Sequence, residues 1–207
     1  MRQDLKQQAK AANDLDEKAD LNRQREEIKI PYDLSYVSNQ DLENYLSDMQ
    51  IAQQYAALNR QRMAQTILKA MKWDKQVIES FDSPHNYIDL KHMILRKGAA
   101  SARKNEKMII PLNMKDGSII GVGKGNDEWN QSGPHGAGRT MSRSQARASI
   151  SLENYQHMMR HVWTTSVSKK TLDEAPKAYK SKKQILTDLH ETMEVKEIIR
   201  PLYNFKG

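Results

Sequence analysis

Cysteine is absent from the 207-residue chain, which excludes disulfide bonds and thiolate metal ligands. No apolar run approaches the ~20 residues that a membrane-spanning helix requires. Residues 1–29 are charged and rich in Gln and Asn, unlike a secretory signal peptide. We therefore expect a cytoplasmic protein that does not enter a membrane, although a lack of cysteine fits any compartment.

The net charge of +7 is unevenly distributed. Residues 1–80 carry 12 basic and 13 acidic side chains, whereas residues 81–207 carry 21 basic and 13 acidic ones. A basic surface favours polyanions through phosphate contacts and counterion release. It is equally compatible with a solvated surface that has no partner, so charge alone gives only mild support for nucleic-acid binding.

The first third of the chain is predicted to be helical. Residues 1–29 have few apolar positions and are expected to form a charged helical or flexible arm. After Pro31, Ser38 or Asn39 can cap a helix that begins near Leu42. Its apolar residues follow the spacing of an amphipathic helix of about thirty residues: Tyr45, Leu46, Met49, Ala52, Ala56, Met63, Ile67, Ala70 and Met71.

Residues 30–207 are predicted to form one α+β domain, with a long helix, a mixed or antiparallel sheet and a loop-rich active-site face. Strands are expected at Tyr87–Leu95, Met108–Leu112 and Ser118–Val122, with Arg96–Ala102 between them. The glycine-rich stretch Gly121–Gly138 is typical of a functional loop. Further helices are expected at Ser142–Ile150, Ser151–Trp163 and Lys182–Leu189, with a turn and short helix from Asp173 and a closing strand at Leu202–Gly207.

The most informative stretch reads Pro134-His135-Gly136-Ala137-Gly138-Arg139-Thr140-Met141-Ser142-Arg143. Glycines allow backbone N–H groups to approach a polyphosphate, and arginines grip phosphate oxygens with planar donors. The histidine stands where an imidazole nitrogen can attack phosphorus and form a phosphoramidate, which fits nucleotidyl transfer. The alternative is that the glycines form only a turn and that the histidine is structural.

Several ordered motifs together resemble the RtcB-type RNA-splicing ligases. They are Asp33–Tyr36, Ala56–Gln61, His85–Tyr87, Arg96–Ala99, Ile110–Pro111, His135–Arg143, Asp173–Lys180 and Lys206–Gly207. The resemblance implies a GTP- and manganese-dependent enzyme of tRNA splicing or RNA repair. Such a ligase guanylylates a histidine, transfers GMP to an RNA 3′-phosphate and seals that end to a 5′-hydroxyl. It first hydrolyses a 2′,3′-cyclic phosphate end.

The resemblance also implies roles for individual residues. His135 matches the guanylylated histidine, and His85 matches a manganese ligand, a role that suits a neutral imidazole. The residues implied to bind the nucleotide are Ser118, Gly136, Ala137, Gly138, Tyr179, Lys206 and Asn113. Those implied to hold phosphates of RNA or nucleotide are Arg139 and Arg143. His157 and His161 are spaced i, i+4 on an expected helix, but nothing supplies further metal ligands, so we assign them a structural role.

The sequence departs from the family pattern in two respects. Family members are about twice this length. The N-terminal half that is missing here carries further ligands of the metal site, namely an aspartate, a bridging cysteine and two histidines. It also carries an asparagine that contacts the nucleotide. In the loop that faces the nucleotide, Leu112-Asn113 replaces Gly-Ser and Lys115 replaces glycine. Asn113 can still donate hydrogen bonds there.

Two functions remain open. The leading hypothesis is an enzyme subunit that binds GTP and RNA ends and is active only with a separate N-terminal half, across a large obligate interface. The alternative is a non-catalytic remnant that binds nucleotide or RNA ends. The altered loop at 112–115 favours the remnant, whereas the intact His85, His135 and Lys206 favour the enzyme. A truncated product without function is a third possibility.

Overall fold

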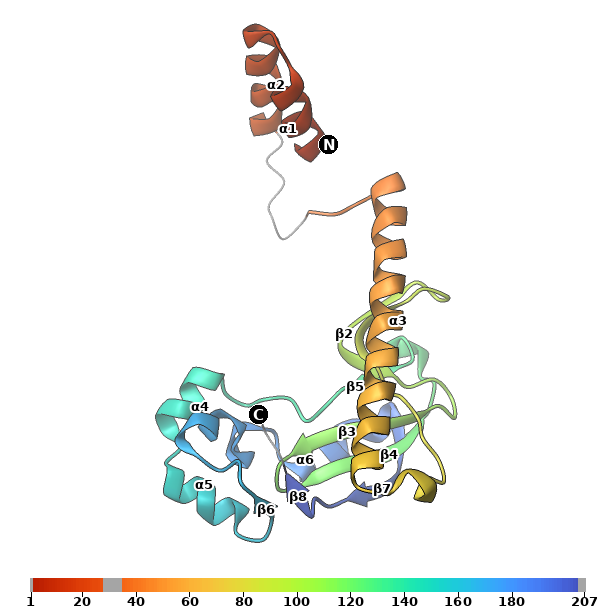
Figure 1. Cartoon of the computed structure of the whole chain (residues 1–207), viewed down its shortest axis with the longest axis vertical. Coiled ribbons are helices and arrows are strands. Elements are labelled where there is room, and N and C mark those ends of the chain that lie inside the picture. The colour runs from red at the N-terminus through yellow and green to blue at the C-terminus, as the bar shows by residue number, and fades with distance from the viewer. Residues whose placement is uncertain (1, 28–34, 205–207) are drawn as a thin grey trace. The chain divides into compact units, whose positions relative to one another are not determined.

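A computed structural model describes residues 2–27 and 35–204, which fall into two compact units, residues 1–48 and 49–207 (Figure 1). In the first unit, α1 (Arg2–Ala11) and α2 (Leu15–Glu27) pack against each other, and Ala9 is buried. The Asp14 carboxylate accepts hydrogen bonds from the N–H groups of Asp16 and Glu17 and so caps α2. The described part of the predicted arm is therefore helical.

The predicted long helix is confirmed as α3 (Asn39–Ala70), a helix of 32 residues. None of these residues is buried, although the helix carries the predicted apolar stripe. Within the second unit, polar contacts tie the helix to later segments of the chain. The Gln53 side-chain oxygen accepts a 2.7 Å hydrogen bond from the Ile88 N–H, and the Arg60 guanidinium pairs with the Asp82 carboxylate. Beyond α3 lies the short 3-10 helix η2 (Asp74–Gln76).

The first sheet has the order β1-β2-β5 and is antiparallel. Its strands are β1 (His85–Asp89), β2 (Ile94–Ser101) and β5 (Ser132–Pro134). The expectation of one strand over Tyr87–Leu95 was wrong, because the chain turns back after Asp89, whose carbonyl and carboxylate accept from the His92 N–H. The segment Arg96–Ala102, expected as a connection, supplies most of the central strand β2.

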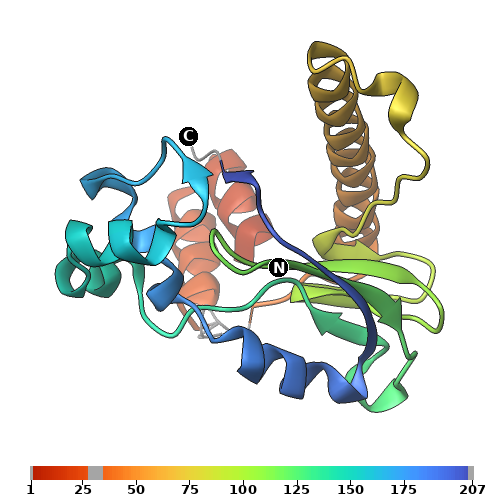
Figure 2. The same ribbon diagram turned by 90° about the horizontal axis from the view of Figure 1, so that it is seen from below.

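The second sheet has the order β3-β4-β7 and is also antiparallel. Two of its strands, β3 (Lys107–Asn113) and β4 (Gly117–Gly123), agree with the sequence, whereas β7 (Met193–Ile199) was not predicted. Helix α6 (Lys182–Asp188) runs along this sheet (Figure 2). It completes a core whose fully buried members are Ala100, Ala102, Met108, Ile110, Leu112, Ile119, Ala137, Ile185, Leu189 and Met193.

A second core is formed by residues of two short helices and of the segment 172–179, together with Met114. The helices α4 (Arg143–Ser149) and α5 (Leu152–Met159) lie close to their predicted positions. Short 3-10 helices complete the chain: η3 (Asp127–Trp129), η4 (Lys169–Glu174), η5 (Pro176–Ala178) and η6 (Leu189–Glu191). The predicted closing strand is present as β8 (Tyr203–Asn204), which pairs in parallel with β6 (Trp163–Thr164). The α+β class is confirmed, and no helix among the described residues is long and apolar enough to cross a membrane.

A buried arginine connects all three strands of the first sheet. The Arg96 guanidinium on β2 donates to the Ser132 hydroxyl of β5 at 2.9 Å and to the Tyr87 hydroxyl of β1 at 3.2 Å. It also lies 3.3 Å from the carboxylate of Asp89, which Arg103 contacts at 2.7 Å. Burial alone would raise the pKa of Asp89, but hydrogen bonds from Arg103, His92 and Arg96 outweigh it and hold this pKa well below its usual range.

We expect Asp89→Asn to lower the free energy of unfolding by about 3 kcal/mol at pH 7, because it leaves a buried guanidinium without its carboxylate. The folded-state pKa is depressed, so this stabilisation is complete above the unfolded value of about 3.9 and is lost as the pH falls through the folded value. Urea unfolding at pH 7 and pH 3 measures the difference, which should shrink at the lower pH. The exposed Asp188→Asn is the control, and equal losses in both variants would contradict the assignment.

Candidate functional site

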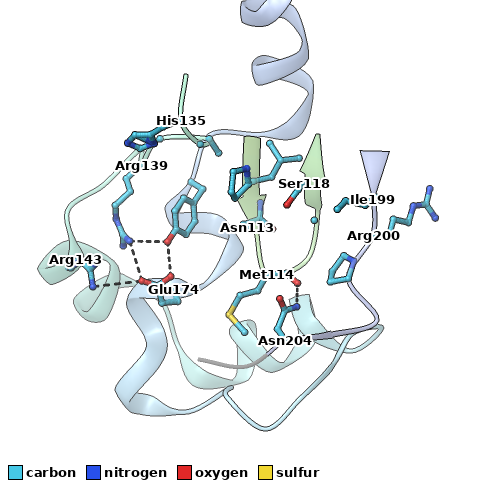
Figure 3. Close-up of a pocket in the computed structure, with 18 residues that line it drawn as sticks. Asn113, Met114, Ser118, His135, Arg139, Arg143, Glu174, Ile199, Arg200 and Asn204 are labelled. Atoms are coloured by element: carbon cyan, nitrogen blue, oxygen red, sulfur yellow. Dashed lines mark hydrogen bonds and ion pairs between the residues drawn. The ribbon is translucent and has the colours of Figure 1, made fainter. Parts of the chain in front are cut away.

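A pocket of about 530 Å³ lies between the two cores, within the size range of small-molecule sites (Figure 3). Its walls come from the ends of β3, β4 and β7, from the loop at 135–143 and from residues near 174–179. Nine of the residues that the sequence singles out line it: Asn113, Ser118, His135, Gly136, Ala137, Gly138, Arg139, Arg143 and Tyr179. Lys206 lies outside the described residues.

The first sheet brings the two candidate histidines together. His85 at the start of β1 pairs with Ala100, and Pro134 at the end of β5 pairs with the adjacent Ala99. Because β2 lies between these strands, His85 and His135 meet at one edge, with ring centroids 4.9 Å apart. Burial, and then the charge on His85, lowers the pKa of His135. The lowered pKa favours the neutral ring, which is the nucleophilic form.

The loop that follows His135 is fixed by backbone hydrogen bonds on both sides. The Ala137 N–H donates to the Pro111 carbonyl at 3.0 Å, and the Lys180 N–H donates to the Gly138 carbonyl at 3.1 Å. Gly138 has a φ of +70°, a left-handed conformation that glycine adopts without strain. The small residues therefore both form a turn and line the pocket. Because the Ala137 N–H is occupied, any phosphate contact from this backbone falls to Gly136 and Gly138.

The Arg139 guanidinium is held by neighbouring groups in the wall of the pocket (Figure 3). It donates to the carbonyls of Met141 and Asp173 and, at 3.2 Å, to the Tyr179 hydroxyl, and it lies 4.9 Å above the Tyr179 ring centroid. That hydroxyl donates to the Glu174 carboxylate at 2.8 Å. Burial and the Glu174 contact raise the pKa of Tyr179 to about 12, so its proton stays in place at neutral pH.

Arg143 is much more accessible than Arg139, with 69% of its side chain exposed against 23%. It begins α4, where Ser142 and Gln145 form a capping box. One guanidinium nitrogen lies 3.2 Å from the Asp173 carboxylate, which also accepts from Arg147 at 3.1 Å. Burial would raise the pKa of Asp173, but the hydrogen bond and charge of Arg147 and the charge of Arg143 lower it. The exposed guanidinium of Arg143 is thus the one positioned to turn toward a phosphate.

Asn113 and Ser118 lie across the pocket from Arg139 and Arg143 (Figure 3). The Asn113 side-chain oxygen accepts from the N–H groups of Lys115 and Asp116 at 2.9 Å, and its amide donates to the Asp116 carboxylate. Asn113 therefore shapes the turn between β3 and β4, and this turn takes up part of its hydrogen-bonding capacity. Ser118 is the second residue of β4 and pairs with Ile199.

Comparison with known proteins identifies the family. Residues 8–207 match the family model described as tRNA-splicing ligase RtcB. The chain belongs to the RtcB family. Its matched range begins within α1 and so takes in most of the helical arm as well.

The curated relatives are about twice as long as the part that matches. The chain is 31% identical over 192 residues to the RNA-splicing ligase RtcB of Escherichia coli K12, covering 84% of this chain and 47% of the relative. It is 33% identical over 192 residues, with the same coverage, to RNA-splicing ligase RtcB1 of a second Escherichia coli strain. It is 29% identical over 224 residues to the tRNA-splicing ligase RtcB of Nanoarchaeum equitans, covering 88% of this chain and 45% of the relative. The chain thus spans about half the length of these RtcB relatives.

Some pocket residues of this RtcB family member were not predicted from the sequence to belong to the site. Glu174 lies in a motif that was recognised, yet its contact with Tyr179 depends on the fold. Arg200 follows the unpredicted strand β7, so no sequence signal indicated its position at the pocket. Asn204 on β8 donates its amide to the Met114 carbonyl and closes the lower wall.

The described residues do not by themselves fit the manganese site that the RtcB resemblance implies. His85 stands beside His135, but no group of three His, Asp or Glu side chains in residues 2–27 and 35–204 is placed to hold a metal ion. The chain has no cysteine to bridge two ions. A metal bound at His85 therefore needs ligands from elsewhere.

We expect Arg139 and Arg143 to differ in their effect on stability. Arg139→Ala should lower the free energy of unfolding by about 2–3 kcal/mol, because the variant leaves carbonyls and a hydroxyl unpaired in the pocket wall. Arg143→Ala removes a largely exposed ion pair, which contributes about 1 kcal/mol or less. Urea unfolding of both variants measures the contrast. An equal or larger loss for Arg143→Ala would show that the assignment is reversed.

Proposed function

We propose that the chain is the nucleotide- and RNA-end-binding part of a GTP- and manganese-dependent RNA ligase. The ligase joins RNA 2′,3′-cyclic phosphate or 3′-phosphate ends to 5′-hydroxyl ends in tRNA splicing or RNA repair. The names of the relatives, RNA-splicing and tRNA-splicing ligases, support this reaction class. The observation that carries the proposal is the position of His135, at the edge of a nucleotide-sized pocket beside His85 and within the arginine-bearing loop.

His135 is the nucleophile of the proposed first step. A lone pair of its neutral ring attacks the α-phosphorus of GTP, so that a P–N bond forms while the P–O bond to pyrophosphate breaks. The guanidinium of Arg143 offsets the charge that develops on the phosphoryl oxygens, and Arg139 holds the Tyr179 ring in place. His135 then transfers GMP to an oxygen of the RNA 3′-phosphate, which restores the imidazole, and the RNA 5′-hydroxyl displaces GMP.

A second polypeptide completes the proposed enzyme by supplying the metal ligands that the described residues lack. His85 is the ligand that this chain contributes. The bound metal would supply Lewis-acid stabilisation of phosphate charge next to His135. The complementary N-terminal half therefore has to dock with its donors facing the edge of the first sheet at which the two histidines meet.

An unpartnered face of α3 supports the existence of such a partner. In the second unit, Ile51, Tyr55 and Leu58 follow the i, i+4, i+7 spacing of one helix face, and all three are exposed. They lie opposite the face from which Gln53 contacts Ile88. A long helix in a soluble protein gains most of its stability from burying an apolar face. The exposed stripe thus fits a helix that is covered in the complete ligase.

The proposed nucleophile can be tested by transfer of label from α-labelled GTP with Mn²⁺. We expect label on this chain only when it is mixed with the N-terminal half of an Escherichia coli relative, and none on His135→Ala. His190→Ala, which removes an exposed histidine, should retain full labelling. The comparison requires that all variants bind the added half, which gel filtration establishes.

One observation favours the alternative of a non-catalytic remnant. The Asn113 amide and the Ala137 N–H, both in the pocket wall, are used within the protein. A remnant would bind GTP or RNA 3′-phosphate ends in the stable mixture without labelling His135. That result would reject the enzyme and retain a binding protein.

The docking face gives an independent prediction. Replacing Tyr55 and Leu58 by Asp should weaken association with the added half at least about tenfold, because each charge would have to be desolvated in an apolar interface. Gln50→Asp introduces a charge away from the stripe and should have little effect. Isothermal titration of the two polypeptides measures both. Unchanged affinity in the double variant would exclude this face of α3 from the interface.

A further inference from the structure

A second hollow of about 520 Å³ lies at the C-terminal end of α5 and along β6, outside the nucleotide pocket. We call it the α5–β6 hollow. Its lining residues are Gln156, Met159, Arg160, His161, Val162, Trp163, Thr164 and Val167. None of these residues has a part in the proposed chemistry at His135.

Trp163 lines this hollow, and its partner in the β6–β8 ladder is a second exposed aromatic residue, Tyr203. Trp163 of β6 is 81% exposed and Tyr203 of β8 is 54% exposed. The two residues are paired in the parallel ladder, and the Tyr203 hydroxyl lies 3.0 Å from the Thr165 hydroxyl, two residues after Trp163. The Tyr203 ring is thus held on the face of the ladder that Trp163 also occupies. Exposed, fixed aromatic rings are the surfaces on which unpaired bases stack.

A positive charge is held in the lining of the same hollow as Trp163. The Arg160 guanidinium donates to His161 Nε2 at 2.9 Å and to His157. These imidazoles orient the guanidinium but, unlike carboxylates, do not neutralise its charge. His157 and His161, to which the sequence analysis assigned a structural role, thus orient Arg160. A guanidinium group suits contact with a phosphate.

The hollow and the nucleotide pocket share the β6–β8 ladder. Thr164, which lines the hollow, donates its hydroxyl hydrogen bond to the Asn204 carbonyl at 2.8 Å. Asn204 lines the nucleotide pocket and donates its amide to Met114 there. Adjacent residues of one short ladder therefore connect the pocket to the hollow.

We propose that the α5–β6 hollow binds the single-stranded RNA next to the end held in the nucleotide pocket. Bases stack on Trp163 and Tyr203, and a backbone phosphate contacts Arg160. The orientation of the RNA strand on this surface rests on the proposed function, which places the RNA end in the pocket. The charge of Arg160 and the continuity with the pocket favour RNA over an apolar protein segment as the occupant.

The test compares the affinity of the full chain for two labelled probes, a uridine decanucleotide and a uridine dinucleotide, each with a 3′-phosphate. We expect Trp163→Ala to weaken decanucleotide binding at least about fivefold, the lower end of the stacking range, and to leave dinucleotide binding unchanged. Trp73→Ala, which removes another exposed indole, should change neither. Arg160→Ala should weaken the decanucleotide and reduce its salt slope by about 1.

The outcomes separate this proposal from the ligase reaction. If the wild type binds both probes equally, or if Trp163→Ala binds the decanucleotide normally, the hollow is not an RNA site, whatever the labelling of His135. If Trp163→Ala instead weakens association with the added half, the hollow is a protein interface. If the variants weaken the decanucleotide as expected while His135 takes no label, the RNA site stands and the ligase reaction is rejected.

Discussion

The contact between His85 and His135 depends on the first sheet, whose three strands are linked by hydrogen bonds from Arg96. A guanidinium has donors pointing in several directions in one plane, so it can satisfy acceptors on β1, on β5 and in the loop that precedes β5 at once. Its burial would be costly without the carboxylate of Asp89. Because this sheet sets the relative positions of its strand ends, the link extends to the contact between His85 and His135.

Patterns of local origin allowed much of the fold to be predicted. The apolar repeat of α3 and the short apolar runs of β3 and β4 depend on neighbours in sequence, and both were recognised. Strand β2 was missed because Gly98 and Ala99 have little intrinsic strand preference, and its conformation comes from pairing with β1 and β5. Strand β7 was missed because the adjacent charged residues Lys196 and Glu197 interrupt its alternation, at the point where the register with β4 shifts.

The candidate site likewise combines contacts within short segments of the sequence with contacts that only the fold creates. Nine of the site residues predicted from the sequence line one pocket, whereas His85 lies outside its lining. The hydrogen bonds and ion pairs that these side chains make could not be predicted from the sequence. Arg139 is held by Asp173 and Tyr179, which lie more than thirty residues away along the chain, and only the fold brings them together. Asn113, by contrast, bonds within its own turn, and its Asn-x-x-Asp spacing carried that signal.

The pocket and the α3 face differ in how complete they are, and this difference constrains how the proposed ligase would be assembled. Every wall of the pocket comes from the second unit, and Arg139 and Arg143 already have carboxylate partners. Its shape therefore does not require a second polypeptide. Under the proposed function, the α3 face and the surroundings of His85 do require one, the first for burial and the second for further metal ligands. In the proposed ligase, a partner that docks on α3 would switch on chemistry at His135 by completing the metal site, without having to create the nucleotide site, because the pocket is preformed.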